Sequence, residues 1–144
     1  MKIFVIPSWY PYPSNPINGT FFKDHAEKMQ AAGHDVTLVA TEIISLKSIF
    51  SSRSDLGKKV YTEQGVKTYQ QILMNHHPGN LPKFYERYKK EFKAQLEEAI
   101  KEEGLPELFH VHSSLWAGAA LCEMNLGIPI VVSEHIKEFL IDDG

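Results

Sequence analysis

The chain has 144 residues, of which 43% are hydrophobic, and a formal net charge of −3. This length and apolar content suit one domain with a sizeable core, and the charge argues against a nucleic-acid binder that works through bulk positive charge. The single cysteine, Cys122, cannot form an internal disulfide. We expect it to be a small core residue in a reducing compartment.

The two ends of the sequence bear on where the protein works. The first apolar run, Ile3 to Ile6, is far too short for the core of a signal peptide, and no run approaches the length of a membrane span. We therefore expect a cytoplasmic protein that can still contact a membrane surface from its inner side. The sequence stops soon after an apolar run at 139–141, so we expect the natural chain to continue past Gly144.

The run at 3–6 has the continuous apolar pattern of a strand that is buried on both faces of a sheet. A loop rich in proline follows at 7–19 and carries Trp9, Tyr10 and Tyr12. Proline disfavours both helix and regular strand. The aromatic side chains are placed either to stack on sugar rings or to fold back over the edge of the sheet.

The first helix is predicted to begin near Asn18 to Thr20 and to end at Ala32, because Phe22, Ala26 and Met29 share one helical face and a glycine follows. A second strand is predicted at 35–40, which completes a strand–helix–strand unit and favours a parallel sheet. Gly19 then lies at the helix N-terminus. Free N–H groups there suit a phosphate or a sugar hydroxyl, although a glycine can also serve only to make the turn.

The middle of the chain is harder to interpret. The segment 41–59 has mixed character, and its apolar residues suggest a short amphipathic helix. Two runs around Gly65 at 60–73 predict a hairpin or a bent strand. The loop at 74–82 contains His76 and His77, and because adjacent side chains point in different directions we do not expect them to bind a metal together.

The longest helix is predicted at 83–103, where apolar residues recur every four positions and Gly104 follows. Its first half is basic and its second half acidic, which opposes the helix dipole. This face is either simply solvated or forms a basic patch for anionic lipid or phosphate.

Two strands, 108–112 and 129–133, flank a helix for which Ser113 or Ser114 is a natural N-cap. His112 closes the first strand, and Glu134 and His135 follow the second. Ligands of open parallel sheets bind beyond the carboxyl ends of the strands, so these side chains mark the expected site. His110 shares a strand face with His112 but lies further from that end, and we expect it to be structural.

Five motifs in this order resemble one family. They are IPSWYP, N-P-x-x-G-x-F-F, A-G-H-D-V, H-V-H and G-I-P-x-V-V-x-E-H, and together they are similar to the N-terminal domain of the retaining family-four glycosyltransferases of the GT-B type. The resemblance implies an α/β fold, with a Rossmann-like, doubly wound, mainly parallel sheet and helices on both faces. Residues 1–144 would be the acceptor-side half, and a C-terminal donor-binding domain would be missing.

The resemblance also implies a set of site residues. It maps a glycine near the donor phosphates or the acceptor onto Gly19, and a histidine near the transferred sugar onto His112. A neutral imidazole at that place can hydrogen-bond a sugar hydroxyl or help to stabilise the leaving diphosphate, unless it is a buried histidine that only the backbone satisfies. We predict that His112 is catalytic and that the substrate-binding residues are Trp9, Tyr10, Asn18, Gly19, Thr20, Ser113, Glu134 and His135.

The resulting hypothesis is a glycosyltransferase that moves a hexose from a nucleoside-diphosphate sugar to a glycan or a lipid-linked acceptor. It needs no cofactor, and the absence of an Asp-x-Asp cluster gives no reason to expect a metal. These residues alone would be nearly inactive, because transfer requires the donor and acceptor to be held together. The alternative is a freestanding Rossmann-like module that binds a carbohydrate or a nucleotide without catalysis.

Overall fold

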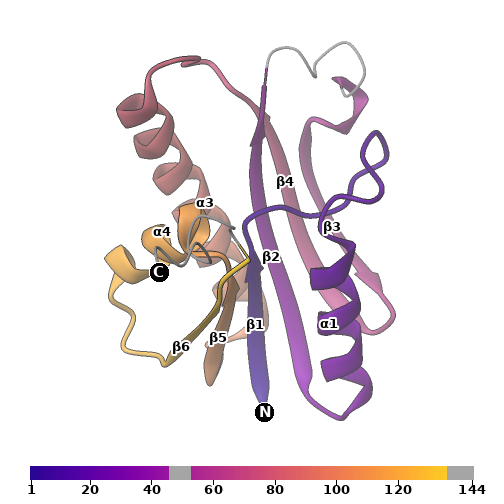
Figure 1. The fold of residues 1–144 in the computed structure, drawn as a ribbon. Coiled ribbons are helices and arrows are strands. Elements are labelled where there is room, and N and C mark those ends of the chain that lie inside the picture. The colour runs from indigo at the N-terminus through magenta and orange to yellow at the C-terminus, as the bar shows by residue number, and fades with distance from the viewer. Residues whose placement is uncertain (46–52, 136–144) are drawn as a thin grey trace, which may run out of the picture.

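The structure is a computed structural model that describes residues 1–45 and 53–135. Within these ranges, one six-stranded sheet has the strand order β3-β4-β2-β1-β5-β6 (Figure 1). The strands are β1 (Lys2–Pro7), β2 (Asp35–Ile44), β3 (Gly57–Glu63), β4 (Val66–Met74), β5 (Leu108–His112) and β6 (Ile130–Ser133). The helices are α1 (Thr20–Ala31), α3 (Leu81–Glu103) and α4 (Ala119–Met124), with single turns η2 (Arg53–Asp55) and η3 (Ser114–Gly118).

Every neighbouring pair of strands is parallel except β3 and β4. These two form an antiparallel hairpin around Gln64 and Gly65, both of which have positive φ. The mainly parallel sheet confirms the predicted α/β, Rossmann-like fold, and the hairpin confirms the prediction for 60–73.

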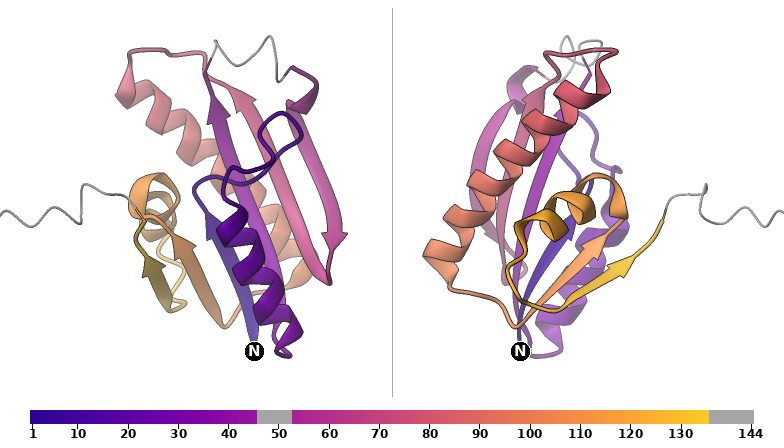
Figure 2. Two further views of the ribbon diagram at one scale, coloured as in Figure 1. Left: turned by 45° about the vertical axis from the view of Figure 1, so that its right-hand side comes forward. Right: turned by 90° about the vertical axis from the view of Figure 1, so that its left-hand side faces the viewer.

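Helices cover both faces of the sheet, and Figure 2 shows α1 on one side and the longer α3 on the other. Alternate residues of β1 follow this division. Ile3 and Val5 belong to the core cluster that also contains Ala26 of α1, whereas Phe4 belongs to the cluster that contains Phe92 of α3. This alternation is what a strand buried on both faces requires.

Local signals explain where the helices begin and end. The side chain of Asn80 accepts a hydrogen bond from the N–H of Lys83 and so caps α3, and the N–H of Gly104 donates to Ile100 at its other end. Gly19, in the left-handed conformation with a φ of 70°, precedes α1. The predictions for these two helices are confirmed. None of the helices formed by the described residues combines the length and the apolar character that crossing a bilayer requires.

The structure corrects three expectations. The short helix suggested within 41–59 does not include 41–44, where β2 continues to Ile44 and pairs with Met74, or 57–59, where β3 begins at Gly57, and residues 46–52 lie outside the described residues. Cys122 is exposed and is not a core residue. The helix predicted after β5 is short, since regular α4 begins only at Ala119. The apolar run at 139–141 lies outside the described residues.

Candidate functional site

The predicted site lies where three parallel strands end side by side. Pro7 at the end of β1 pairs with His112 of β5, and His112 pairs with Ser133 of β6. Glu134 and His135 follow directly. This register brings together the polar residues that the sequence placed at the carboxyl edge of the sheet.

His112 and His135 are in contact at this edge. Nδ1 of His112 lies 3.2 Å from Nε2 of His135. His112 is only 1% exposed, and its ring stacks on Phe22 of α1 with centroids 4.6 Å apart and an interplanar angle of 23°. His135 borders the surface above this buried ring, because it also lines a hollow at the start of α1.

Burial is the main cause that lowers the pKa of His112 to about 3, and the neighbouring imidazoles of His110, His135 and His25 lower it further. Burial and two of these neighbours also lower the pKa of His110. Both rings are therefore neutral at physiological pH. A neutral ring has one donor and one acceptor nitrogen, so it can hydrogen-bond a hydroxyl without placing a positive charge in the core.

The loop between β1 and α1 forms the wall of a hollow of about 270 Å³, which we call the aromatic hollow. Trp9 packs against Phe22 with centroids 5.1 Å apart. The backbone of Gly19 approaches so closely that a Cβ atom there would lie 2.8 Å from the carbonyl oxygen of Trp9. The hollow is lined by Trp9, Ile17, Gly19, Thr20, Phe21, Phe22 and His135.

Tyr10 and Asn18 do not line the aromatic hollow. Tyr10 is 3% exposed and lies in the core on the α1 side of the sheet. Its ring therefore offers no surface on which a sugar could stack. It folds back over the sheet, which is the second of the two alternatives predicted for the aromatic residues of this loop. Asn18 donates from Nδ2 to the carbonyl of Tyr10 and to Glu42 of β2. Its side chain thereby ties the loop to the sheet.

Glu134 organises the turn after β5. One oxygen of its carboxylate accepts hydrogen bonds from the Ser114 N–H, at 3.0 Å, and from the Ser114 hydroxyl, at 2.6 Å. The other accepts from the N–H of His135 at 3.1 Å. Ser113 occupies the position before η3 but its side chain makes no capping bond, so the predicted serine cap is wrong: the carboxylate of Glu134 binds the turn instead.

Sequence reasoning missed two residues beside this site. His25 of α1 lies with its ring centroid 5.5 Å from that of His112. Because His25 lies three residues after Phe22, the two side chains share one helical face. This spacing could have predicted that His25 lies near the site. Burial raises the pKa of Glu42 to about 7, against the opposing effect of the Asn18 hydrogen bond.

Two basic side chains in the first half of α3, Lys89 and Arg87, make close contacts. Lys89 lies 2.8 Å from Glu86 and 3.2 Å from Glu123. Arg87 donates to the backbone carbonyl of Met74. The Met74 carbonyl holds the Arg87 guanidinium in place but does not neutralise its charge, so both alternatives for this face, solvated or lipid-binding, stay predictions.

Comparisons with known proteins identify the family of the chain. The model for the family described as Glycosyltransferase Family 4 matches residues 19–140. A protein of Bacillus subtilis (strain 168), described as "Putative teichuronic acid biosynthesis glycosyltransferase TuaC", is 25% identical over 143 residues. The match covers 94% of this chain but only 36% of that protein.

A solved structure shares the fold alone. The C-terminal domain of a hydrogenase from Pyrococcus furiosus superposes with a TM-score of 0.59 at 15% identity, over 92% of this chain and 90% of that one. The family match, by contrast, extends over most of the chain and includes the predicted site residues from Gly19 to His135, whereas Trp9, Tyr10 and Asn18 lie before the matched range. The chain therefore belongs to glycosyltransferase family 4.

Proposed function

We propose that this chain forms the acceptor-side domain of a glycosyltransferase that moves a hexose from a nucleoside-diphosphate sugar to a glycan or a lipid-linked acceptor. The observation that carries the proposal is the family match over residues 19–140, which contains the histidine pair at the carboxyl edge of the sheet. The chain spans 36% of the length of its Bacillus relative. We propose that a further domain, outside these residues, holds most of the donor.

Within this proposal His112 and His135 act as a pair. His135 lines the aromatic hollow and makes the direct contact with a sugar hydroxyl, while His112, at 3.2 Å behind it, fixes the orientation of that ring. The hydrogen bond between the two rings orients His135, and such a bond becomes stronger as negative charge develops on the leaving diphosphate. Trp9 and Gly19 provide the wall and the close backbone approach for the same substrate.

The first experiment is to read the source gene past the codon for Gly144. If the frame continues for roughly another domain of 150 to 250 residues, transferase assays belong on the whole product. If it stops there, the transferase proposal fails, and the aromatic hollow becomes a binding site whose carbohydrate or nucleotide must be sought directly.

The second experiment measures turnover of nucleoside-diphosphate sugars by the whole product and by its His112→Ala and His135→Ala variants. Losing a positioned hydrogen-bonding group is expected to lower kcat by roughly a hundredfold or more. His34→Ala is the control, because His34 lies in the turn before β2, at the opposite edge of the sheet. Unchanged turnover in both site variants would contradict the assigned roles.

A further inference from the structure

A second hollow opens at the carboxyl edge of the sheet, between the start of α3 and the turn η3. Its volume is about 360 Å³, and we call it the Trp116 hollow. Its lining is formed by Asn75, His77, Gly79, Asn80, Leu81, Phe84 and Trp116. Asn75 directly follows β4, and Trp116 lies in the turn after β5. Both strands run parallel to β1, so these two ends lie at the edge where His112 and His135 meet.

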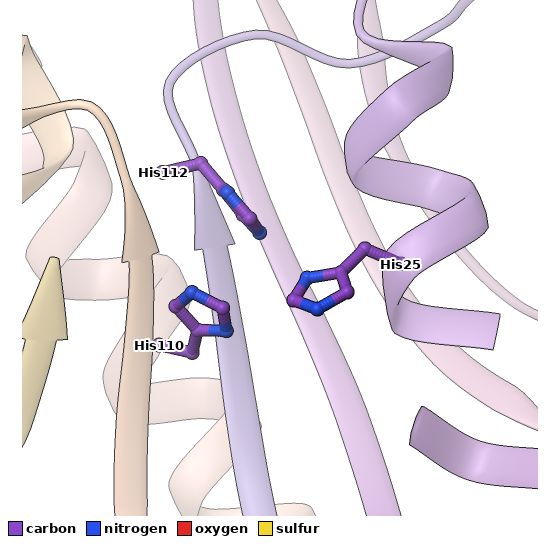
Figure 3. A group of neighbouring side chains, drawn as sticks. All are labelled: His25, His110 and His112. Carbon is purple, nitrogen blue, oxygen red and sulfur yellow. The ribbon is translucent and has the colours of Figure 1, made fainter. Parts of the chain in front are cut away.

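The Trp116 hollow is separate from the aromatic hollow. Trp116 packs against the core cluster that contains Phe92 of α3. The rings of His110 and His112 instead face His25 of α1, on the other side of the sheet (Figure 3). Among the described residues, none lines both hollows. The edge therefore has room for a second group of a ligand.

Trp116 is held in place by two aromatic rings of α3. Its ring centroid lies 5.9 Å from that of Phe84, at an interplanar angle of 62°, and 5.3 Å from that of Tyr85, at an angle of 40°. Trp116 and Phe84 are half-buried. A fixed aromatic ring offers a flat apolar surface and loses little side-chain entropy when a ligand binds. This surface suits the C–H face of a sugar ring.

Two asparagine side chains add hydrogen-bonding groups to the same hollow. Oδ1 of Asn75 accepts from the N–H of His77 at 2.8 Å, and Oδ1 of Asn80 accepts from the N–H of Lys83 at 3.2 Å. These bonds fix the planes of both amides. Within the described residues the two Nδ2 groups make no hydrogen bond, so each can donate to the hydroxyls of a ligand.

The charge of the lining indicates the class of ligand. No lysine, arginine, aspartate or glutamate is among the described residues that line the Trp116 hollow. A diphosphate is normally bound by cationic side chains, and a lipid chain would leave both amides without partners. A small pocket with aromatic walls and a few fixed polar groups suits a neutral, polyhydroxylated ligand.

We propose that the Trp116 hollow binds a neutral saccharide unit, with its ring on Trp116 and its hydroxyls on Asn75 and Asn80. The inference rests on the proposed function for the role of this saccharide, which is then part of the acceptor. It deepens that proposal, because it assigns a neutral sugar to this place and not a lipid chain or the nucleotide.

One carboxylate connects this hollow with the histidine pair. Glu134 accepts from the N–H of Ser114 at 3.0 Å and, with its other oxygen, from the N–H of His135 at 3.1 Å. Trp116 follows Ser114 by two residues, a length of chain of at most roughly 7 Å. A short oligosaccharide can therefore lie with one unit on Trp116 and another near His135.

The test is the binding of an array of immobilised oligosaccharides, some neutral and some containing uronic acids, by the whole gene product. We expect neutral oligosaccharides to bind, and calorimetry gives the affinity for the one that binds most strongly. Trp116→Ala should weaken this affinity by roughly tenfold or more, because it removes the stacking surface. Trp116→Phe keeps an aromatic face and should keep most of the affinity.

A matched pair of surface variants separates lost binding from lost folding. Leu81 lines the hollow and is 58% exposed, so Leu81→Arg obstructs the hollow without opening the core. It should also weaken binding by roughly tenfold or more. Leu105→Arg is the control and should bind as the wild type does, since Leu105 is 62% exposed and lies between α3 and β5, at the opposite edge of the sheet.

Release of nucleoside diphosphate from nucleoside-diphosphate sugars is measured in parallel and reports the donor reaction without the acceptor. If the wild type releases none while Leu81→Arg loses oligosaccharide binding, the proposed function fails and the saccharide site stands. The inference itself is overturned if the wild type binds no neutral oligosaccharide, if Trp116→Ala and Leu81→Arg bind as tightly as the wild type, or if Leu105→Arg weakens binding as much as Leu81→Arg.

Discussion

The imidazole of His112 stacks on the ring of Phe22, with centroids 4.6 Å apart. Phe22 is 3% exposed and also contacts Trp9 and His135. One buried side chain of α1 thus joins the strand end, the proline-rich loop and the segment after β6. Packing, and not only hydrogen bonding, sets the position of the histidine pair.

Phe22→Ala should therefore destabilise the protein much more than Phe21→Ala. Removing a buried phenylalanine leaves a cavity and costs about 3–5 kcal/mol in the free energy of unfolding. Phe21 is 62% exposed, so its truncation should cost less than about 1 kcal/mol. Urea unfolding of the two variants measures the difference. Equal losses of stability would show that the packing of Phe22 does not stabilise the carboxyl ends of the strands.

Two glycines with positive φ provide a matched test of the aromatic hollow. Gly19→Ala places a Cβ 2.8 Å from the carbonyl oxygen of Trp9, whereas at Gly33 a Cβ meets nothing within 4 Å. In both variants an alanine must adopt a backbone conformation with positive φ, which lowers the free energy of unfolding by about 1–2 kcal/mol. Only Gly19→Ala also introduces a steric clash. We expect Gly19→Ala to lose at least about 1 kcal/mol more than Gly33→Ala.

The clash should also move the loop. In a Trp116→Phe background the fluorescence comes from Trp9, and Gly19→Ala should shift its emission while Gly33→Ala does not. If the two variants have the same stability and the same emission, the loop accommodates the added Cβ atom. The close approach of Gly19 to Trp9 would then not be needed to shape the hollow.

Much of this architecture is readable from local patterns. The apolar residues that recur every four positions predict α3, and the continuous apolar runs predict β1, β5 and β6, because burial on a helix stripe or on both sheet faces leaves these signatures. The meeting of His112 with Glu134 and His135 also follows, since parallel strands end at one edge.

Other features depend on contacts that no local pattern encodes. Residues 41–44 extend β2 because β4 pairs with them as far as Met74, and their apolar residues alone suit a helix equally well. The meeting of His25 with His110 and His112 depends on the exact seating of α1 on the sheet. The exposure of Cys122 depends on which face of α4 packs inward, and there Ala120 and Leu121 are buried whereas Cys122 is not.

Adjacent serines after β5 are expected to respond in opposite ways. Ser114→Ala removes a 2.6 Å hydrogen bond to the carboxylate of Glu134, and bonds to charged groups contribute about 1.5–3 kcal/mol. The hydroxyl of Ser113 is buried without a partner among the described residues. Its removal should leave the stability unchanged or slightly higher.

Thermal or urea unfolding of the two serine variants gives the comparison, with Glu134→Gln as a third variant that keeps an acceptor but loses the charge. The result that counts against the account is a Ser113→Ala loss as large as that of Ser114→Ala. In that case the two hydroxyls, and not the carboxylate, would hold the turn.

Glu42 should make stability depend on pH in the direction opposite to that of a salt-bridged acid. Burial raises its pKa from the ordinary 4.5 to about 7 in the folded protein. Between these values the folded state keeps a proton that the unfolded state has released, so stability falls as the pH rises through this window. Over the whole window the free energy of unfolding should fall by on the order of 3 kcal/mol.

Glu42→Gln removes this ionisation and keeps an oxygen to accept from Asn18. At about pH 4 the variant and the wild type should be similarly stable, and at about pH 8 the variant should be more stable by up to that amount. Glu97→Gln is the control, since Glu97 is exposed on α3 and its effect should stay within about 0.5 kcal/mol at both pH values. Urea unfolding at the two pH values measures all three proteins. A Glu42→Gln difference that stays flat with pH would mean that water reaches the carboxylate and that the loop does not bury it.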